Sequence, residues 1–521
     1  MTITHYIAHW AEQAPDKTYL VAPEPNEQVS FSELQDYVSI VSRHLEALGA
    51  PRGAHVATLM DNGKWTGLLF LAIMASGRVV VPLNAISGDS QLEYVLDHSD
   101  ADLLFASAGH LDRGHKISQA SEREIRVIPT CPDQGPEWPG EPAPAQGYQT
   151  PVPTPDDNAL LIYTSGTTGK PKGVMLTQQN VIGGGLNTVE AHCLSKDDRG
   201  LCVLPLYHIN AEIVTMVAPL ISGGSVVLPH RFSASQFWDL LMDHQCTWFS
   251  VVPTIIAYLL ERAETHPVEV RDNPRLAQLR FGRSASSALP PEAHRAFEER
   301  FGIALIETMG LSETAAQILS NPLPPFEFKY GSPGIAYRNE VKVVLENGRD
   351  APAGEPGELH VRGDNVLNGY YKNPEATASA LTPDGWFATG DLGYQDEEGF
   401  FYITGRLKEL IIKGGENIAP REIDEALLKH PAVLEAAAFG VEDKNYGQEV
   451  MACVVLKEGK QASPEDLRQA AARELGAYKA PRELHVVQWL PKGPSGKVQR
   501  LKIPDMLYEL SSAPGATANG A

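Results

Sequence analysis

Cysteine is scarce in this chain of 521 residues, which contains only five, at Cys131, Cys193, Cys202, Cys246 and Cys453. They are scattered, odd in number and show no C-x-x-C spacing, so the sequence excludes a zinc ribbon and a disulfide framework. Scattered, unpaired thiols are typical of a reducing compartment. We therefore expect a cytoplasmic protein in which the cysteines are structural.

The chain also lacks an excess of positive charge and a long apolar run. Its 43 Lys and Arg face 65 Asp and Glu, and the net charge of −22 argues against general binding to nucleic acid or anionic membranes. The longest apolar stretch, residues 67–77, stops at Arg78 and is too short to span a bilayer. Residues 1–6 have neither the basic nor the apolar region of a signal peptide, and we expect none.

Helical and strand patterns alternate along the first half of the chain. Apolar residues in 31–48 recur at helical spacing, and 67–77 predicts a buried helix. Short apolar runs predict strands at 55–60, 79–82, 159–162, 203–206, 225–228 and 248–253. Such alternation indicates a parallel sheet flanked by helices.

Two later regions differ from this pattern. Residues 340–402 contain short strands with turns at Asn347-Gly348, Pro356-Gly357 and Glu398-Gly399, typical of antiparallel sheet. The last hundred or so residues have the size of a small α+β domain. We therefore expect an α/β protein. A large N-terminal domain, 1–405, should contain parallel and mixed sheets flanked by helices plus a β-rich part. A small C-terminal domain, 406–510, and a disordered tail, 511–521, should follow.

One loop is rich in hydroxyls, glycines and lysines. Residues 163–174 read Tyr-Thr-Ser-Gly-Thr-Thr-Gly-Lys-Pro-Lys-Gly-Val and follow the apolar run 159–162. Glycines let the backbone approach an anion, while N–H groups, hydroxyls and ammoniums supply donors. The loop predicts a polyphosphate site, the alternative being a solvated turn. It is not a Walker A loop, because Pro171 stands where that motif needs Ser or Thr.

Four further segments carry polar residues in glycine-rich loops, at 306–314, 385–393, 406–418 and 490–500. Each has an ordinary explanation when taken alone. In chain order these are a Ser-Glu helix cap, a Thr-Gly-Asp turn, a domain junction with a glycine loop, and a solvated basic loop. Their order behind the first loop is more specific than any one of them.

Together the five segments resemble the signatures of the adenylate-forming superfamily, in its acyl-CoA synthetase branch. The resemblance covers essentially the whole chain. It implies a mobile C-terminal domain and the use of ATP, Mg²⁺ and coenzyme A. A carboxylate would attack the α-phosphate of ATP, giving an acyl-adenylate and pyrophosphate, and a thiol would then displace AMP. Such catalysis depends on positioning and charge neutralisation.

The resemblance also implies which residues act. Catalytic roles would belong to Thr164, Glu313, Arg406 and Lys497, and Glu313 and Thr164 would hold Mg²⁺. Contacts to ATP or coenzyme A are implied for Thr164, Ser165, Gly166, Thr167, Thr168, Gly169, Lys170, Lys172, Ser286, Ser287, Ala288, Glu307, Thr308, Met309, Gly310, Ser312, Asp391, Arg406, Lys408, Lys413, Gly414, Gly415 and Lys497. The family has Tyr where this chain has Met309, so ring stacking on adenine is weaker or absent.

Several of these roles are specific. Asp391 would accept hydrogen bonds from both ribose hydroxyls, and Arg406 would donate to the same sugar. Lys408 would be the hinge for the C-terminal domain, and Gly414 and Gly415 would let pantetheine pass close to the backbone. Lys497 would bridge the acid carboxylate and the α-phosphate.

Two segments, 206–212 and 281–289, should line the acid pocket by analogy. They offer His208, Asn210, Arg283 and Ser284, whereas a fatty-acid pocket should be apolar. Arg283 could pair with a second anionic group of the acid; alternatively, it forms a structural salt bridge and His208 is a general gate. Segments 281–289 and 320–325 look like those of plant and fungal oxalate–CoA ligases. We expect a short polar or anionic acid such as oxalate, sulfoacetate or malonate.

Other functions share these motifs. A medium-chain fatty or aryl acid–CoA ligase is one alternative, and a stand-alone adenylation enzyme that loads a carrier protein is another. The chain ends soon after Lys497, so we expect no carrier domain in it. A non-catalytic relative would be expected to lose Lys497, Glu313 or the loop lysines. A luciferase-like monooxygenase rests on fold analogy alone. The expected partners are small molecules, without nucleic acid or membrane, for a monomer or homodimer.

Overall fold

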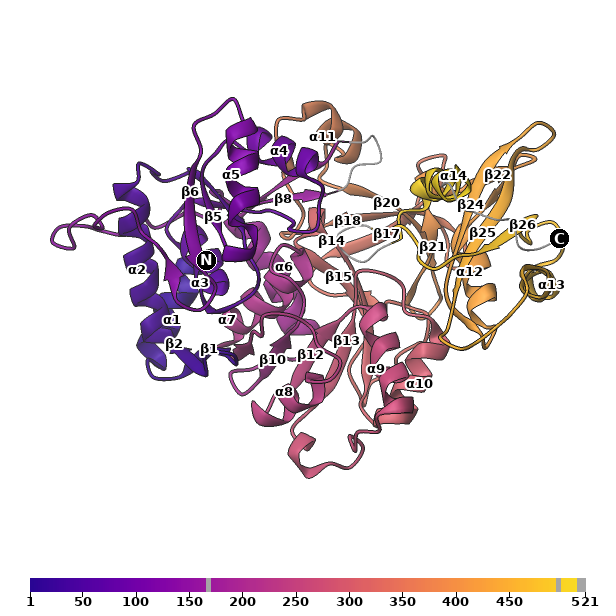
Figure 1. Ribbon diagram of the computed structural model, residues 1–521, viewed down its shortest axis with the longest axis horizontal. Coiled ribbons are helices and arrows are strands. Elements are labelled where there is room, and N and C mark those ends of the chain that lie inside the picture. The colour runs from indigo at the N-terminus through magenta and orange to yellow at the C-terminus, as the bar shows by residue number, and fades with distance from the viewer. Residues whose placement is uncertain (165–169, 493–497, 513–521) are drawn as a thin grey trace. The chain divides into compact units, whose positions relative to one another are not determined.

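The computed structural model describes residues 1–164, 170–492 and 498–512, with side chains described as far as residue 510 (Figure 1). The chain separates into two compact units. The first consists of Met1–Leu289, His294–Val341 and His360–Ala388. The second consists of Pro290–Ala293, Lys342–Leu359 and the residues from Thr389 onward.

An eight-stranded sheet carries the glycine-rich loop at the end of one strand. Its strands follow the order β19 (Gly369–Tyr370), β9 (Lys172–Thr177), β8 (Asn158–Thr164), β4 (Val79–Pro82), β3 (His55–Leu59), β5 (Ala101–Ala106), β6 (Arg126–Cys131) and β7 (Gly135–Pro136). β3, β4, β5 and β8 are parallel and almost entirely buried, as expected of strands covered on both faces. β9 returns antiparallel to β8 and forms the other side of the loop.

A nine-stranded sheet forms the rest of the core of the first unit. Its order is β16 (Ile335–Ala336), β15 (Ala316–Ser320), β14 (Leu305–Leu311), β13 (Phe281–Ser284), β12 (Trp248–Val251), β10 (Arg199–Cys202), β11 (Ser225–Val227), β1 (Thr18–Ala22) and β2 (Glu27–Ser30). The central strands are parallel, and both ends are antiparallel. Side chains at the ends of β12, β13 and β14 can therefore meet at one edge.

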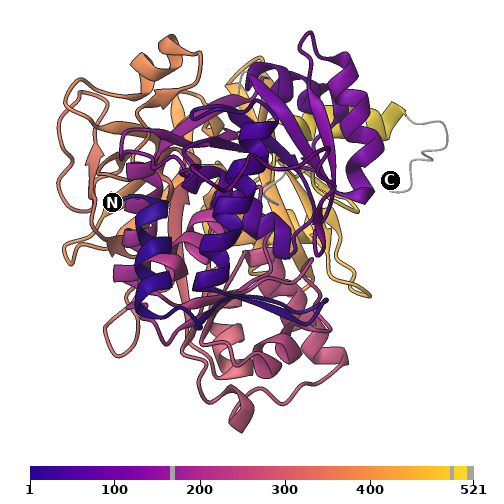
Figure 2. The ribbon, with the colours of Figure 1, turned by 90° about the vertical axis from the view of Figure 1, so that its left-hand side faces the viewer.

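The helices between these strands are α1 (Ile3–Gln13), α2 (Phe31–Ala47), α3 (Lys64–Ala75), α4 (Asp89–His98), α5 (Leu111–Ala120), α6 (Gln178–Ala191), the π-helix η2 (Asn210–Val217), α7 (Ala218–Ser222), α8 (Phe237–Asp243), α9 (Pro253–Thr265), α10 (Pro291–Phe301) and α11 (Pro374–Ala380). α1 and α2, drawn in indigo, lie side by side (Figure 2). α6 contacts β8 and β9 of one sheet and β15 of the other. Its Gly184 permits this approach, since a Cβ there would lie 2.0 Å from the Ala315 carbonyl oxygen.

The second unit is built around a five-stranded sheet of β23 (Glu416–Ile418), β22 (Ile411–Lys413), β25 (Gly447–Leu456), β24 (Val433–Asp443) and β26 (Glu483–Val486). Helices α12 (Pro420–Leu428) and α13 (Pro464–Leu475) pack their apolar residues onto this sheet, and α14 (Ile503–Ser512) follows. A four-stranded sheet contains β17 (Glu340–Val344), β18 (Gly357–Arg362), β20 (Phe387–Gln395) and β21 (Phe401–Arg406). The expected antiparallel pairing is confirmed for β20 and β21.

Most of the expected elements are present, and the expected α/β class is confirmed. The helix from Phe31 and the strands at 55–60 and 79–82 lie within one residue of their expected ends. The strand expected at 203–206 is wrong: β10 ends at Cys202, and the next residues turn, because Pro205 cannot donate to a sheet ladder. Within the described part of the chain, no helix is long and apolar enough to cross a membrane.

Candidate active site

Strands β8 and β9 hold the two ends of the glycine-rich loop. Thr164, the last residue of β8, is the register partner of Lys172, the first residue of β9. Ser165, Gly166, Thr167, Thr168 and Gly169 lie outside the described residues. The Lys170 Nζ is 5.2 Å from the centroid of the Tyr94 ring. The described ends of the loop thus present one hydroxyl and two ammoniums.

Tyr370 connects this loop to Glu313. It stands on β19 as the register partner of Val174 in β9, and the Lys172 Nζ lies 4.9 Å from the centroid of its ring. The Tyr370 hydroxyl donates a hydrogen bond of 3.0 Å to Glu313 Oε1. Burial, and then the Glu313 carboxylate, raise the pKa of Tyr370, so the hydroxyl remains a donor at neutral pH. The structure therefore brings Lys172 and Glu313 to one aromatic side chain, Lys172 over its ring and Glu313 at its hydroxyl.

Glu313 and Thr164 have the chemistry of magnesium ligands. Mg²⁺ prefers oxygen donors and usually takes one or two from protein, keeping water and phosphate oxygens for the rest. Glu313 is partly buried on the short helix η4 (Ser312–Thr314), and the Leu367 N–H donates to its carbonyl oxygen at 2.8 Å. Among the described residues, no cluster of three or more metal-binding side chains occurs. A magnesium ion held here would need phosphate or water ligands, as a nucleotide site provides.

The implied nucleotide residues lie along β14 and the segment after β13. Glu307 and Thr308 are buried on β14, and the Leu289 N–H donates to Glu307 Oε1 at 3.0 Å. Ser286 has a left-handed φ of 72°, and Ser287 and Ala288 beside it are exposed. The hydrogen bond from Leu289 thus ties this exposed turn to β14.

Met309, Gly310 and Ser312 continue the same strand into η4, and all three are partly buried. A β-bulge separates Met309 from Gly310. Gly310 cannot carry a side chain, because a Cβ would lie 1.9 Å from the Ala316 carbonyl oxygen. The bulge and this glycine direct the chain toward Glu313.

The four side chains expected in the acid pocket are largely buried. Ser284 is fully buried, Asn210 is buried at the start of η2, and His208 is half-buried. The His208 carbonyl oxygen accepts a hydrogen bond of 3.1 Å from the Glu212 N–H. Arg283 is buried in the middle of the nine-stranded sheet.

Arg283 donates to four neutral oxygens. Its Nη1 bonds Asn210 Oδ1 and, at 3.0 Å, Ser250 Oγ. Its Nη2 bonds Thr308 Oγ1 and, at 3.2 Å, Gln317 Oε1. One residue expected for the acid, Asn210, and one expected for the nucleotide, Thr308, therefore share the Arg283 guanidinium. Ser250 and Gln317 are additions that sequence reasoning missed.

No carboxylate pairs with Arg283 among the described residues, so the alternative of a structural salt bridge does not hold there. Its Nε is buried and has no hydrogen-bond partner in the described part of the chain. Burial lowers the pKa of the Arg283 guanidinium to about 9, which leaves it cationic at neutral pH. A buried cation without a counter-ion is costly, and an anionic ligand would offset that cost.

In the second unit, the two residues expected to bind ribose lie together. Asp391 and Arg406 are register partners on β20 and β21. The Arg406 Nε donates to Asp391 Oδ1 at 2.8 Å, and Nη2 approaches Oδ2 at 3.4 Å. Asp391 is 4% exposed, so this pairing fixes its carboxylate.

Further along, Lys408 is exposed on the short helix η5 (Leu407–Glu409). Gly414 and Gly415, with φ of 58° and 87°, form the two-residue turn between β22 and β23, where both positions favour glycine. The Lys413 Nζ is buried; it pairs with Glu449 Oε1 at 2.5 Å and donates to the Tyr478 carbonyl oxygen at 2.8 Å. The Lys413 ammonium thus holds the hairpin. Lys497 lies outside the described residues.

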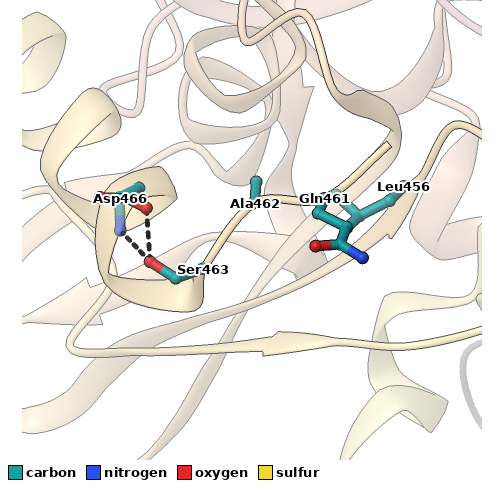
Figure 3. Close-up of a pocket in the computed structure, with 5 residues that line it drawn as sticks. All are labelled: Leu456, Gln461, Ala462, Ser463 and Asp466. Atoms are coloured by element: carbon teal, nitrogen blue, oxygen red, sulfur yellow. Dashed lines mark hydrogen bonds between the residues drawn. The ribbon is translucent and has the colours of Figure 1, made fainter. Parts of the chain in front are cut away.

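None of these residues lines the hollow near α13. Figure 3 shows it bordered by Leu456, Gln461, Ala462, Ser463 and Asp466. The Ser463 hydroxyl donates to Asp466 at 2.7 Å and accepts from its N–H at 3.1 Å. This is an N-cap that stabilises α13, and we assign it no ligand.

Glu212, on the π-helix η2, is a buried acid in the segment 206–212 that we expect to line the acid pocket, although the sequence alone did not single it out. It is fully buried, and neither carboxylate oxygen has a hydrogen-bond partner among the described residues. Burial raises its pKa to about 8, so the side chain is largely protonated at neutral pH.

Glu212→Gln is expected to change how stability depends on pH. Because the pKa of Glu212 rises from 4.5 in the unfolded chain to about 8 in the folded protein, the folded state holds one more proton between these values. The free energy of unfolding of the native protein should therefore fall as pH rises through this window, by up to about 1.4 kcal/mol per pH unit. Relative to the native protein, Glu212→Gln should gain stability from pH 5 to pH 8 in urea titrations. Parallel pH profiles for the two proteins would contradict a buried neutral acid.

The chain matches the family model described as AMP-binding enzyme over residues 7–371, and the model described as AMP-binding enzyme C-terminal domain over residues 422–497.

Two curated relatives are similar over almost their full length. A sulfoacetate–CoA ligase from Cupriavidus necator is 50% identical, with 96% of this chain and 97% of the relative covered. An oxalate–CoA ligase from Arabidopsis thaliana is 34% identical, with the same coverage. Among solved structures, O-succinylbenzoate coenzyme A synthetase from Bacillus subtilis in complex with ATP and magnesium ion is 30% identical. It has a TM-score of 0.84, with 96% of this chain and 99% of that chain covered.

Proposed function

The chain belongs to the AMP-binding enzyme family and is an acid–thiol ligase that uses ATP, Mg²⁺ and coenzyme A, and we propose that its acid is short and carries a second anionic group. Sulfoacetate, whose sulfonate lies close to its carboxylate, fits this description best. Oxalate and malonate belong to the same class of dianionic acids.

The environment of Arg283 is the main support for this proposal. The guanidinium is buried, and its partners among the described residues are all neutral. Moving an anion into a partly dry site is costly unless a fixed cation meets it. A sulfonate or carboxylate would meet that cation here, whereas an alkyl chain would gain nothing from it. The similarity to a sulfoacetate–CoA ligase and an oxalate–CoA ligase supports the same class.

Adenylate formation needs little covalent chemistry from the protein. An acid carboxylate oxygen attacks the α-phosphorus of ATP, the bond to pyrophosphate breaks, and an acyl-adenylate forms. In our proposal, Lys170 and Lys172 neutralise phosphate charge, and Tyr370 fixes Glu313 by its hydrogen bond. Bound Mg²⁺, held by Glu313 and Thr164, would supply further charge neutralisation. Asp391, oriented by Arg406, would accept hydrogen bonds from the ribose hydroxyls.

Thioester formation would follow after a movement of the C-terminal domain. We propose that the domain boundary falls at 405/406 and that Lys408 is the hinge, which lies exposed on a single helical turn. The coenzyme A sulfur then attacks the acyl carbon of the adenylate, and AMP leaves. Gly414 and Gly415, whose φ angles favour glycine, would let pantetheine pass close to the backbone.

Lys408→Pro should slow thioester formation more than adenylate formation. Proline fixes φ near about −65° and restricts the residue before it, so rotation at this position would be blocked. We expect at least a tenfold larger loss in the second half-reaction, on the order of 1.4 kcal/mol in barrier height. Single-turnover measurements on each half-reaction provide the test, with Lys408→Ala as the control that removes the side chain and keeps the backbone free. Native rates in both halves of the proline variant would exclude the hinge.

The cellular location is a separate proposal. All five cysteines are free, and three of them are buried. Free thiols persist in reducing compartments, so we propose that the protein acts in the cytoplasm. Whether it is a monomer or a homodimer stays a prediction, which sedimentation equilibrium would settle.

The reaction class is tested by its products. With ATP, Mg²⁺, sulfoacetate and coenzyme A, the protein should release AMP and pyrophosphate and form one thioester per AMP. Omitting coenzyme A should leave adenylate on the enzyme and stop turnover. Release of ADP, or turnover that requires a carrier protein and not coenzyme A, would contradict the assignment.

A further inference from the structure

We propose that the neutral side chains around Arg283 determine the choice of acid, and that Gln317 is a positioning residue that holds the guanidinium without cancelling its charge. The four side chains, named here the Arg283 cradle, are Asn210, Ser250, Thr308 and Gln317. The inference rests on the proposed function and adds to it the residues that keep the buried cation available.

The cradle draws its members from four elements. Asn210 begins η2, Ser250 stands on β12, Thr308 on β14 and Gln317 on β15. Ser250 is the register partner of Arg283 across β12 and β13, and Thr308 lies two residues beyond Ile306, the partner of Arg283 in β14. The sheet itself thus sets where the guanidinium is held.

Gln317 is fixed from its own strand. It is 1% exposed, its register partner is Gly310 in β14, and its carbonyl oxygen accepts a hydrogen bond of 3.1 Å from Asn187 Nδ2. Its side-chain Oε1 therefore reaches Arg283 from a rigid backbone position. Since Gly310 belongs to the nucleotide segment, Gln317 stands where the acid and nucleotide residues meet.

The four side chains of the Arg283 cradle are uncharged. Amide and hydroxyl oxygens satisfy N–H groups but carry no net charge, so Arg283 is hydrogen-bonded without being neutralised. His192 interacts electrostatically with Arg283. It stays neutral, because burial and then the charge of Arg283 lower the pKa of His192 well below its ordinary value. A carboxylate at any cradle position would satisfy the same N–H groups and would also supply a counter-ion. The cradle therefore reserves the positive charge for a ligand.

A negative charge added to the Arg283 cradle should weaken the binding of some acids more than that of others. A carboxylate in the cradle should weaken binding of sulfoacetate, oxalate and malonate, whose second anion needs an unpaired cation. Propionate carries no second anion and should respond much less. A purely structural defect would lower both classes together.

The test is Gln317→Glu, which is nearly isosteric and adds one negative charge at Arg283. We expect the ratio of kcat/KM for sulfoacetate to kcat/KM for propionate to fall at least about tenfold, with most of the change in KM for sulfoacetate. Gln317→Met is the matched comparison, since it removes the acceptor without adding charge. Its ratio should fall less than that of Gln317→Glu.

Three outcomes would overturn the inference. Equal losses of kcat/KM for both acids in Gln317→Glu would make Gln317 merely structural, and native kcat/KM values for both acids would exclude it from specificity. If Gln317→Glu does not fold, Asn210→Asp places a carboxylate at Nη1, and the same ratio decides the question. A native protein that makes no thioester from sulfoacetate, oxalate or malonate would overturn the proposed function as well, before any variant is compared.

Discussion

Replacing Lys497 with alanine is expected to slow adenylate formation about a thousandfold while leaving thioester formation from supplied acyl-adenylate nearly unchanged. The lysine would stabilise the charge that develops as the acid oxygen attacks phosphorus, and that charge is absent when coenzyme A displaces AMP. Lys497 lies outside the described residues, so the expectation rests on the sequence motif. The measurement is single-turnover kinetics of each half-reaction.

Lys492→Ala is the matched control for this experiment. Lys492 lies in the same segment, but its Nζ pairs with Glu435 Oε1 at 2.6 Å, and no role in either half-reaction is proposed for it. It should keep both rates near those of the native protein. Equal losses in both half-reactions of Lys497→Ala would refute the division of labour between the two steps.

Arg283→Met should lower kcat/KM for sulfoacetate, oxalate and malonate by roughly a few hundred-fold or more. This corresponds to a loss of about 3–5 kcal/mol of transition-state stabilisation. Methionine keeps much of the side-chain length and removes the charge, so the second anion would enter a buried site without a cation. Propionate, which we expect to be a poor substrate of the native protein, should change little. Steady-state kinetics on these acids and on octanoate provide the test.

Arg280→Met serves as the control for loss of a nearby arginine. Arg280 lies just before β13, pairs with Asp198 at 2.6 Å and takes no part in the cradle. It should leave the preference among acids unchanged, even if stability falls. An Arg283→Met protein that treats all the acids as before would exclude Arg283 from substrate recognition.

The parts of the fold that sequence predicts best are those governed by local pattern. The helix from Phe31 has apolar residues at helical spacing and a Ser30–Glu33 capping box, and it forms as expected. The buried strand β4 is a continuous apolar run and is equally clear. The segment at 203–206 is apolar too, yet the chain turns there, because Pro205 cannot join a ladder.

In the candidate site too, the residues that lie in short local motifs can be predicted, and those brought together by the fold cannot. Glycine-rich loops, with their lysines and carboxylates, stand out because each is a short contiguous segment. Tyr370 has no such signal: it meets Glu313 across 57 residues of chain, through the pairing of β19 with β9. Ser250 and Gln317 reach Arg283 from 33 and 34 residues away. Such partners are set by strand register, which a single sequence does not reveal.

We propose that this CoA ligase selects a short acid with a second anion. One competition experiment can decide this selectivity, with sulfoacetate, oxalate, malonate, propionate and octanoate present at equal concentrations together with ATP, Mg²⁺ and coenzyme A. Mass spectrometry of the coenzyme A products reports which acid is used. Thioesters of the dianionic acids, with sulfoacetyl-CoA foremost, should dominate the products. A mixture dominated by octanoyl-CoA or propionyl-CoA would contradict it.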